Sequence, residues 1–499
     1  MNINRNLMKF IFILILLSFV LTSCNSGTET PDTNVSTSNL NFDSLENVED
    51  SDEIIKDSLP ADLDFKGVTV NIHTRGDCDV DTDVPEFGIE KENGDIINDV
   101  LYRRDKNVEE RLNIKLNVIK GGGWQDYNTE MTKLRASIAA GDNSYDLIAG
   151  WSARIPALSL EGSLMNLHDL PYLNLTEPWW NKIIVDETTI NQKLHFAVGD
   201  SNLSLLVTCM VMFINNEVQR QYNLPDIYES VFDGKWTIDY MYDLVKDIHN
   251  DLNGDGKMDE NDLYGIDLYE GNRVDGFLQA SNIKMTKMGS DGIPYLDIEY
   301  EKLANIVEKV YDVIYNNEGS YTNDNFWDYT YDMFRNNQIL ISSGSITIAT
   351  KDLRSMESDY SMVPYPKYDE IQDKYYSRIQ DGVSLLCVPV DCQKKEIIGA
   401  VMEAFGSESY KSVSPAYFDV AMKIKYARDE TSAKMLDIIR EGAYLNFASI
   451  YNESIGNPWF VMRELMSSKS KNFASWYEKN EPKITKAIDK LIDKMEKTE

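Results

Sequence analysis

The stretch from 251 to 262, DLNGDGKMDEND, has the residue types and spacing that best fit a metal site in this chain. Oxygen-bearing side chains fall at alternate positions, and Gly256 stands where the backbone of such a loop must turn sharply. Calcium takes about six to eight oxygen ligands, and a twelve-residue loop supplies them from positions one, three, five, seven, nine and twelve. In that register the predicted ligands are Asp251, Asn253, Asp255, the Lys257 carbonyl, Asp259 and Asp262.

The last ligand position departs from the usual pattern, because Asp262 stands where a bidentate glutamate is common. This departure predicts weaker calcium binding. The alternative to a metal site is an acidic turn held by its own hydrogen bonds. The loop resembles those of dockerin modules, but these carry two loops in tandem. Here one loop is followed by LYGIDLY, which predicts a strand. We interpret the loop as a structural calcium clip on a body whose function lies elsewhere.

The N-terminus predicts export. Arg5 and Lys9 precede an apolar run that is shorter than the roughly 20 residues needed to span a bilayer. The Leu-Thr-Ser-Cys that follows resembles the bacterial lipobox, which implies that Cys24 is the lipid-modified first residue of the mature chain. Residues 25–60 are polar and too poor in apolar groups to fold, so a flexible tether is expected. These features place the protein on the extracellular face of the cell membrane.

The formal net charge of −33 argues against binding to nucleic acid or to acidic lipid surfaces. Apart from Cys24, the cysteines are Cys78, Cys209, Cys387 and Cys392, an even number that permits disulfides but is too sparse for a disulfide framework. Buried free thiols are equally consistent with them. Four histidines and no Cys/His spacing offer nothing for a zinc site.

Apolar periodicity organises the first part of the body. It predicts strand, helix, strand, helix and strand at 68–72, 97–112, 114–118, 127–138 and 146–149. This order indicates a parallel sheet with crossover helices, and ligands bind beyond the carboxyl ends of such strands. Those ends carry Arg75, Trp124 and Trp151. Further buried strands are predicted at 205–213, 339–341 and 383–388, and a helix at 484–495.

Several segments, in this order, resemble one family. They are SIAAGDNSYDLIAGW, VMFINNEV, WTIDYMYDLVKDI, QILISSGS and SESYKSVSPAYFDVAMKIKYARDE, all behind a lipobox and a tether. They resemble the extracellular solute-binding lipoproteins of bacterial ABC importers, of the carbohydrate type related to maltose-binding protein. The resemblance implies an α/β, two-lobed periplasmic-binding-protein-like (type II) fold, with hinge strands between lobes that close on a ligand.

On this resemblance the lobes are joined near Leu205, Ile341 and Val383. The chain then divides into a signal peptide (1–23), the lipidated cysteine and tether (24–60), the first lobe (61–205) and the second lobe (206–338). A return to the first lobe (339–380) and a return to the second lobe with the C-terminal helix (381–499) follow.

The predicted ligand is a carbohydrate, and an oligosaccharide in particular. Aromatic faces stack on sugar rings, while carboxylates, amides and guanidinium groups bind their hydroxyls. Candidate residues at strand ends, crossings and loops are Arg75, Trp124, Trp151, Asp200, Ser201, Trp327, Gly344, Ser345, Asp381 and Trp459. For each tryptophan the alternative is core packing, and for each aspartate a cap or turn. A basic peptide or polyamine is the other ligand class that acidic residues could bind.

The predicted function is therefore capture of a sugar by a monomeric, non-enzymatic lipoprotein, for delivery to the transmembrane subunits of an ABC permease. A secreted glycoside hydrolase is an alternative, since it needs only two carboxylates about 5 to 9 Å apart. A carbohydrate-adhesion lipoprotein is another. No nucleophile elbow or Ser-His-Asp arrangement is present to support an enzyme.

Overall fold

The first sheet contains four strands in the order β13-β3-β1-β2. A computed structural model describes residues 55–76, 85–268, 271–322, 330–418 and 430–497, so Cys24, Cys78 and Trp327 lie outside the described residues. In this sheet β1 (Val68–Thr74) runs parallel to β2 (Ile114–Lys120) and β3 (Leu147–Trp151), whereas β13 (Ser384–Cys387) is antiparallel to β3. The predicted strand–helix alternation is confirmed.

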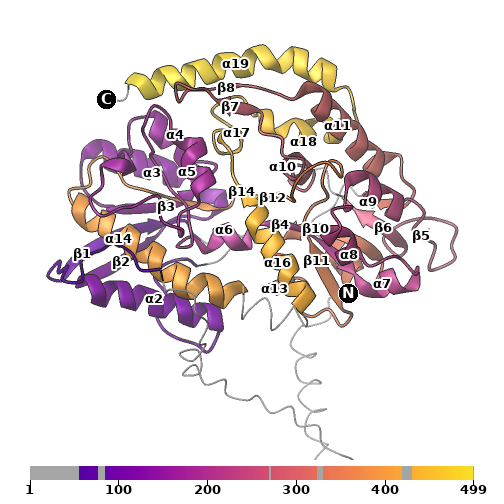
Figure 1. The fold of residues 1–499 in the computed structure, drawn as a ribbon, viewed down its shortest axis with the longest axis horizontal. Coiled ribbons are helices and arrows are strands. Elements are labelled where there is room, and N and C mark those ends of the chain that lie inside the picture. The colour runs from indigo at the N-terminus through magenta and orange to yellow at the C-terminus, as the bar shows by residue number, and fades with distance from the viewer. Residues whose placement is uncertain (1–54, 77–84, 269–270, 323–329, 419–429, 498–499) are drawn as a thin grey trace, which may run out of the picture. The chain divides into compact units, whose positions relative to one another are not determined.

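Helices cover both faces of this sheet. α2 (Ile96–Leu112) and α14 (Lys395–Glu408) lie together on one side, and α3 (Tyr127–Ala140) and α4 (Ile155–Leu160) lie on the other (Figure 1). Local signals set their ends. The Asp95 side chain accepts the Ile97 and Asn98 amides at the start of α2, and Gly141, with φ +64°, ends α3.

The second sheet has the order β11-β4-β10-β6-β5, with β9 paired to β6. Its strands are β4 (Met210–Asn215), β5 (His249–Asn250), β6 (Leu263–Asp267), β9 (Ser320–Tyr321), β10 (Ile339–Ser345) and β11 (Tyr360–Val363). β10 is parallel to β6 and antiparallel to β4. Nearby helices are α7 (Asn216–Gln221), α8 (Ile227–Phe232), α9 (Ile238–Val245), α11 (Tyr300–Tyr315), α12 (Thr330–Arg335), α13 (Thr347–Thr350) and α16 (Glu430–Gly442) (Figure 1).

Short elements complete the fold. They are α5 (Lys182–Thr188), α6 (Leu203–Val207), α10 (Gly276–Ala280), α17 (Phe447–Ile450), α18 (Val461–Ser467) and the paired strands β7 (Thr286–Met288) with β8 (Pro294–Leu296) and β12 (Ser377–Arg378) with β14 (Ala443–Tyr444). The predicted C-terminal helix is α19 (Phe473–Lys497), which contacts α4, α11 and β8. Within the described ranges, no helix has both the length and the apolar character to cross a bilayer.

The order in which the chain visits the two sheets differs from the prediction. Residues 339–380 were expected in the first lobe, but β10 and β11 belong to the second sheet. Residues 381–499 were expected in the second lobe, but β13 and α14 belong with the first sheet. An apolar run predicts burial without saying which sheet buries it, because a strand's partners come from distant segments.

The connection between the sheets differs from the prediction in a second respect. Residues 205–207 were expected in a strand but lie in α6, and the strand begins at Met210. The chain returns to the first sheet between β12 and β13. These two connections run side by side, since the Gln380 amide donates to the Thr208 carbonyl at 3.2 Å and Cys209 pairs with Ile379. They are hinge segments joined by an isolated bridge, and the chain crosses again between α14 on the first sheet and α16 on the second.

The folded body begins before residue 60, where the tether was expected to end. The Arg111 guanidinium on α2 donates to both Asp57 oxygens, at 2.7 and 2.6 Å, and Leu59 is buried. Residues 55–60 are therefore held by the Asp57–Arg111 ion pair, by the Ser407 hydroxyl that also donates to Asp57, and by buried Leu59, which a polar composition does not reveal.

Three of the cysteines are buried free thiols: Cys209, Cys387 and Cys392. Burial raises the pKa of the Cys209 thiol to about 12 and that of Cys392 to about 11, so both stay protonated and unreactive at neutral pH.

Candidate functional site

The carboxyl edge of the first sheet brings together three of the predicted residues. Arg75 follows β1, Trp151 ends β3, and Trp124 follows the glycine turn after β2. The Arg75 guanidinium lies 4.7 Å from the centre of the Trp151 ring, and the Trp124 ring meets Trp151 edge to face at 5.4 Å. The sequence prediction that these strand ends meet is confirmed.

The two tryptophans differ in what they can offer a ligand. Trp151 is only 6% exposed, and Arg75 covers one of its faces. Trp124 is half-buried, as is Tyr127, whose ring centre lies 5.4 Å away. Arg154, which the sequence reasoning missed, lies over Tyr127 at 3.9 Å and pairs with Glu453. Trp124 and Tyr127 are therefore the less buried rings at this edge, with Arg154 covering one face of Tyr127 and lying 5.8 Å from the centre of the Trp124 ring.

Arg154, which lies over Tyr127, also lines a pocket of about 210 Å³. Arg154 and Asn128 line it from the first lobe, and Glu453 from the loop after α17. Its wall thus combines a guanidinium, an amide and a carboxylate, which are groups that bind hydroxyls.

The segment Asp381–Gly382 connects this edge to a set of charged groups. The Arg75 Nη1 donates to the Gly382 carbonyl, and the Ser152 hydroxyl to the Asp381 carbonyl at 2.9 Å. The Asp381 carboxylate accepts from Arg378 at 2.9 Å and from Arg463 at 3.5 Å. The predicted residue Asp381 thus belongs to the same region as Arg75 and Trp151.

We call Asp275, Arg378, Asp381 and Arg463 the Asp275 cluster. Arg463 is hydrogen-bonded to Asp275, and Arg378 lies 3.7 Å from it. Asp275 follows β6, whose last residue, Asp267, pairs with Arg273 at 3.1 Å. The carboxyl edge of the second sheet therefore also presents charged groups, next to the segment that the first sheet holds.

Burial shapes the electrostatics of the Asp275 cluster. It raises the pKa of Asp275 to about 6, and the charges of Arg463 and Arg378 limit the rise. Among the described residues, Arg378 Nε and Nη1 and Asp275 Oδ1 have no hydrogen-bond partner. Buried polar groups of this kind gain when a partner arrives, and a hydroxyl can both donate to the carboxylate and accept from the guanidinium.

Gly344 and Ser345, at the end of β10, have packing roles. A side chain at Gly344 would overlap the Tyr331 hydroxyl, which donates to the Ser343 carbonyl at 3.2 Å. The buried Ser345 hydroxyl contacts Thr347, which in turn donates to the Val207 carbonyl of α6 at 3.0 Å. These contacts hold the end of β10 against α6, where the chain passes from the first sheet to the second.

Three other predicted residues lie apart from the two edges. Trp459 is 1% exposed and its amide donates to Asn452, which fits core packing. Ser201 is buried and donates to Asn202. Asp200 lines a different pocket, of about 270 Å³, where Ser414 donates to it and burial raises its pKa.

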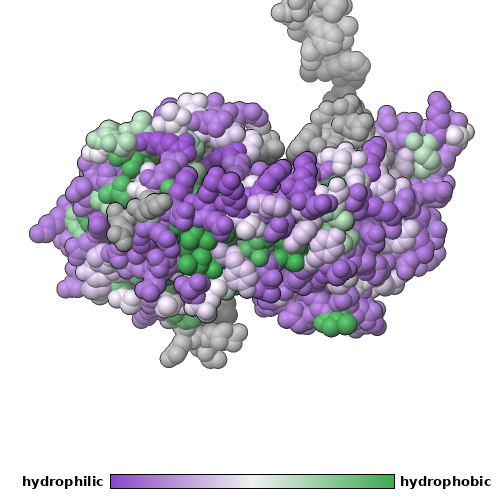
Figure 2. All heavy atoms as spheres, turned by 90° about the horizontal axis from the view of Figure 1, so that it is seen from above, coloured by the Kyte–Doolittle hydropathy of each residue, from purple (hydrophilic) through white to green (hydrophobic). Residues whose placement is uncertain are grey.

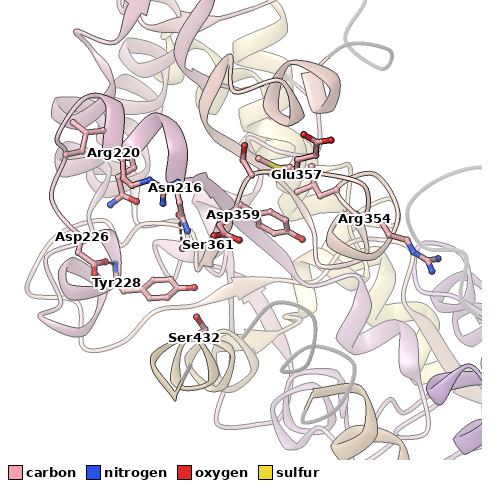
Figure 3. A pocket seen from close by; sticks show the side chains of 15 residues that line it. Asn216, Arg220, Asp226, Tyr228, Arg354, Glu357, Asp359, Ser361 and Ser432 are labelled. Atoms are coloured by element: carbon pink, nitrogen blue, oxygen red, sulfur yellow. Dashed lines mark hydrogen bonds between the residues drawn. The ribbon is translucent and has the colours of Figure 1, made fainter. Parts of the chain in front are cut away.

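The second-sheet side carries a polar pocket of about 610 Å³ between α7, α8 and the start of β11. Figure 3 shows the Tyr228 ring pointing across it toward Ser361, with Asp226 and Arg220 on one side. None of the predicted ligand residues that are described lines this pocket. The face of the molecule in Figure 2 is mainly hydrophilic, and its apolar residues form small, separate patches.

The acidic loop forms a hydrogen-bonded turn. The two oxygens of Asp251 accept the Gly254 and Gly256 amides at 2.6 and 2.8 Å, and Asp262 accepts the Leu252 and Asp259 amides, both at 2.9 Å. In the described parts of the chain no group of three or more His, Cys, Asp or Glu is arranged to hold a metal. An ionised carboxylate has about four acceptor sites, so these bonds do not exhaust it. Calcium binding stays a prediction.

No family model and no curated protein matches this sequence. Solved structures do match. An ABC substrate-binding protein from Listeria monocytogenes in complex with cycloalternan is 13% identical, with a TM-score of 0.51, over 87% of this chain and 99% of that one. The sugar-binding protein MalE from Xanthomonas citri is 11% identical, with a TM-score of 0.53, over 86% and 98%.

A third similar structure is the maltose-binding protein MalE from Listeria monocytogenes in complex with maltose. It is 12% identical, with a TM-score of 0.50, over 85% of this chain and 97% of that one. At these identities the likeness concerns the fold. The chain has the two-lobed α/β fold of ABC sugar-binding proteins of the maltose-binding-protein type, as its sequence segments predicted.

Proposed function

We propose that this protein captures an oligosaccharide between its two lobes and delivers it to an ABC permease. The observation that carries the proposal is the meeting of the two carboxyl edges at Asp381–Gly382. One edge supplies half-buried rings, and the other supplies buried guanidinium and carboxylate groups with unfilled hydrogen-bond positions. Similar structures holding cycloalternan and maltose support the ligand class.

The proposed mechanism is lobe closure. Trp124 and Tyr127 offer ring faces to a pyranose, and the Asp275 cluster binds its hydroxyls. A ligand that contacts both lobes does so only in the closed form, and it shifts the population toward that form by this difference in affinity. The closed surface then engages the transmembrane subunits of the permease.

Cys24 carries the lipid anchor in this proposal, and the polar segment after it holds the body away from the membrane. A single acyl chain binds a membrane only weakly and reversibly, so stable anchoring needs two such membrane-binding signals. The protein then works on the extracellular face as a monomer, and it releases its sugar chemically intact.

A glycan panel tests the proposal. At about 100 times Kd, a bound ligand stabilises the protein by about 2.7 kcal/mol, which a thermal shift detects. A Trp124→Ala variant should weaken binding about tenfold through lost ring contact, whereas Tyr295→Ala, an exposed ring on β8, should not. A panel without any shift would contradict sugar capture, and one glycan recovered shortened would favour a hydrolase.

We also propose that the loop 251–262 binds calcium as a structural clip. Its ligand spacing supports this, and so do the remaining acceptor sites of Asp251 and Asp262. Calcium should raise the melting temperature of the apo protein, and Asp251→Asn should abolish the increase. Asp243→Asn, at an exposed ion pair outside the loop, is the matched control.

A further inference from the structure

Glu86 is a buried carboxylate that touches two of the connections between the lobes, the one through α6 and the one between β12 and β13. Its Oε1 accepts from the Ser204 amide at 2.9 Å and from the Ser204 hydroxyl at 2.6 Å. Its Oε2 accepts from the Ser384 hydroxyl at 2.5 Å. Ser204 lies in α6, at the first connection, and Ser384 starts β13, at the return.

The two serines are also bonded to each other. The Ser384 amide donates to the Ser204 hydroxyl at 2.9 Å, and Asn202 donates to the Ser384 hydroxyl, also at 2.9 Å. All of these side chains are buried. Hydrogen bonds to a buried charged group are stronger than neutral ones, so this set resists separation of the two segments.

The backbone around Glu86 is fixed to the first lobe. Arg104 on α2 donates to the Glu86 carbonyl, and the Gly88 amide donates to Asp105 at 2.8 Å. Between them the Phe87 ring packs edge to face on Phe405 of α14, with centres 5.0 Å apart. The carboxylate therefore cannot follow the second lobe when the lobes move.

Arg75 links this arrangement to the proposed ligand site. Its Nε lies 4.0 Å from Glu86, while its Nη1 donates to the Gly382 carbonyl and its guanidinium covers Trp151. The first lobe thus holds the chain at Ser204, at Gly382 and at Ser384. The segments left between these points and the second sheet are 208–209 and 379–381.

We propose that Glu86 is a positioning residue that clamps these two connections to the first lobe, so that their bending during lobe rotation is confined to residues 208–209 and 379–381. Glu86, Ser204 and Ser384 form this hinge clamp. Its role in ligand capture rests on the proposed function. The clamp keeps the carboxyl edges of both sheets in register at Asp381, where the ligand would bind. Without it, closure must also order the connections, which costs conformational entropy.

Hydrogen–deuterium exchange of the full mature protein without ligand tests the clamp. Glu86→Gln places an amide N–H₂ where one acceptor stood, so at least one serine contact is lost. Peptides covering 203–209 and 379–387 should exchange about tenfold faster, because their protection comes from local opening. Ser384→Ala should reproduce the effect in both peptides.

Asp146→Asn is the matched control. Asp146 is equally buried in the first lobe, accepts the Asn71 amide at 2.8 Å and pairs with Lys394 at the opposite edge of the sheet. It should lower the melting temperature without selective exchange at the two peptides. Unchanged exchange in Glu86→Gln, or faster exchange spread evenly over the chain, would overturn the proposal.

A ligand found in the glycan panel gives a second readout. Glu86→Gln should weaken its binding several-fold, while Trp124→Ala weakens binding without altering exchange at the hinge. Undiminished affinity in Glu86→Gln would contradict the coupling of clamp and capture. If no glycan binds the wild-type protein, the proposed function fails, and the exchange experiment still decides the clamp.

Discussion

Glu403 on α14 carries the sharpest pH prediction of the structure. Its side chain is buried, and burial raises its pKa from 4.5 to about 7, although the Asn174 amide and the Trp180 indole donate to Oε2 at 3.2 and 3.3 Å. Its Oε1 has no partner among the described residues. The folded protein therefore binds this proton more tightly than the unfolded chain does.

The sign follows from linkage. A carboxyl with a raised folded pKa stabilises the fold fully below its unfolded pKa, and this contribution is lost as pH rises from 4.5 to about 7. The full shift corresponds to about 3 kcal/mol, and solvent screening reduces it to about 1 to 2 kcal/mol. Glutamine keeps the acceptor and removes the charge, so Glu403→Gln should be the more stable protein above pH 7.

Urea unfolding of both proteins at pH 5 and pH 8 measures the effect. The difference in unfolding free energy, variant minus wild type, should increase by about 1 to 2 kcal/mol between the two pH values. Glu177→Gln, at the neighbouring carboxylate that raises the Glu403 pKa, should give a smaller change of the same sign. A difference that stays constant or decreases with pH would refute the reasoning.

Four further outcomes are expected. Trp124→Ala should weaken glycan binding about tenfold in calorimetry, with the melting temperature of the apo protein nearly unchanged. Chelation should lower the melting temperature equally with and without glycan if calcium is a clip, whereas a cation that switches binding on and off would contradict that role. Asp57→Asn should cost about 1 to 3 kcal/mol at pH 7, and because Arg111 and Ser407 hold the pKa of Asp57 at about 2, this loss should shrink as pH falls below 4. Cys24→Ala should release the protein from cells into the medium, and a variant retained in the membrane fraction would exclude the lipid anchor.

The sequence predicted the first carboxyl edge well, because Arg75, Trp124 and Trp151 each follow an element with clear apolar periodicity. It could not predict their burial: Arg75 covers one face of Trp151, a contact between residues far apart in the chain. Trp459 was a loop candidate for ligand binding, but it is buried, and its amide donates to Asn452.

Of the four residues in the Asp275 cluster, the sequence predicted only Asp381 as a candidate. Its members come from the segment after β6, from β12, from the return connection and from α18, and they share no motif. The hinge clamp is similar, since Glu86 stands in no recognisable pattern and meets Ser204 and Ser384 only through the fold. Buried polar networks join distant segments, and apolar periodicity does not register them.

Small-angle scattering of the mature protein with and without a glycan that gives a thermal shift is the most direct test of capture by lobe closure. The radius of gyration should fall when the glycan is added, and the glycan should be recovered at its original length. A glycan that binds without any change in the radius of gyration, or one that is recovered as shorter fragments, would contradict the account.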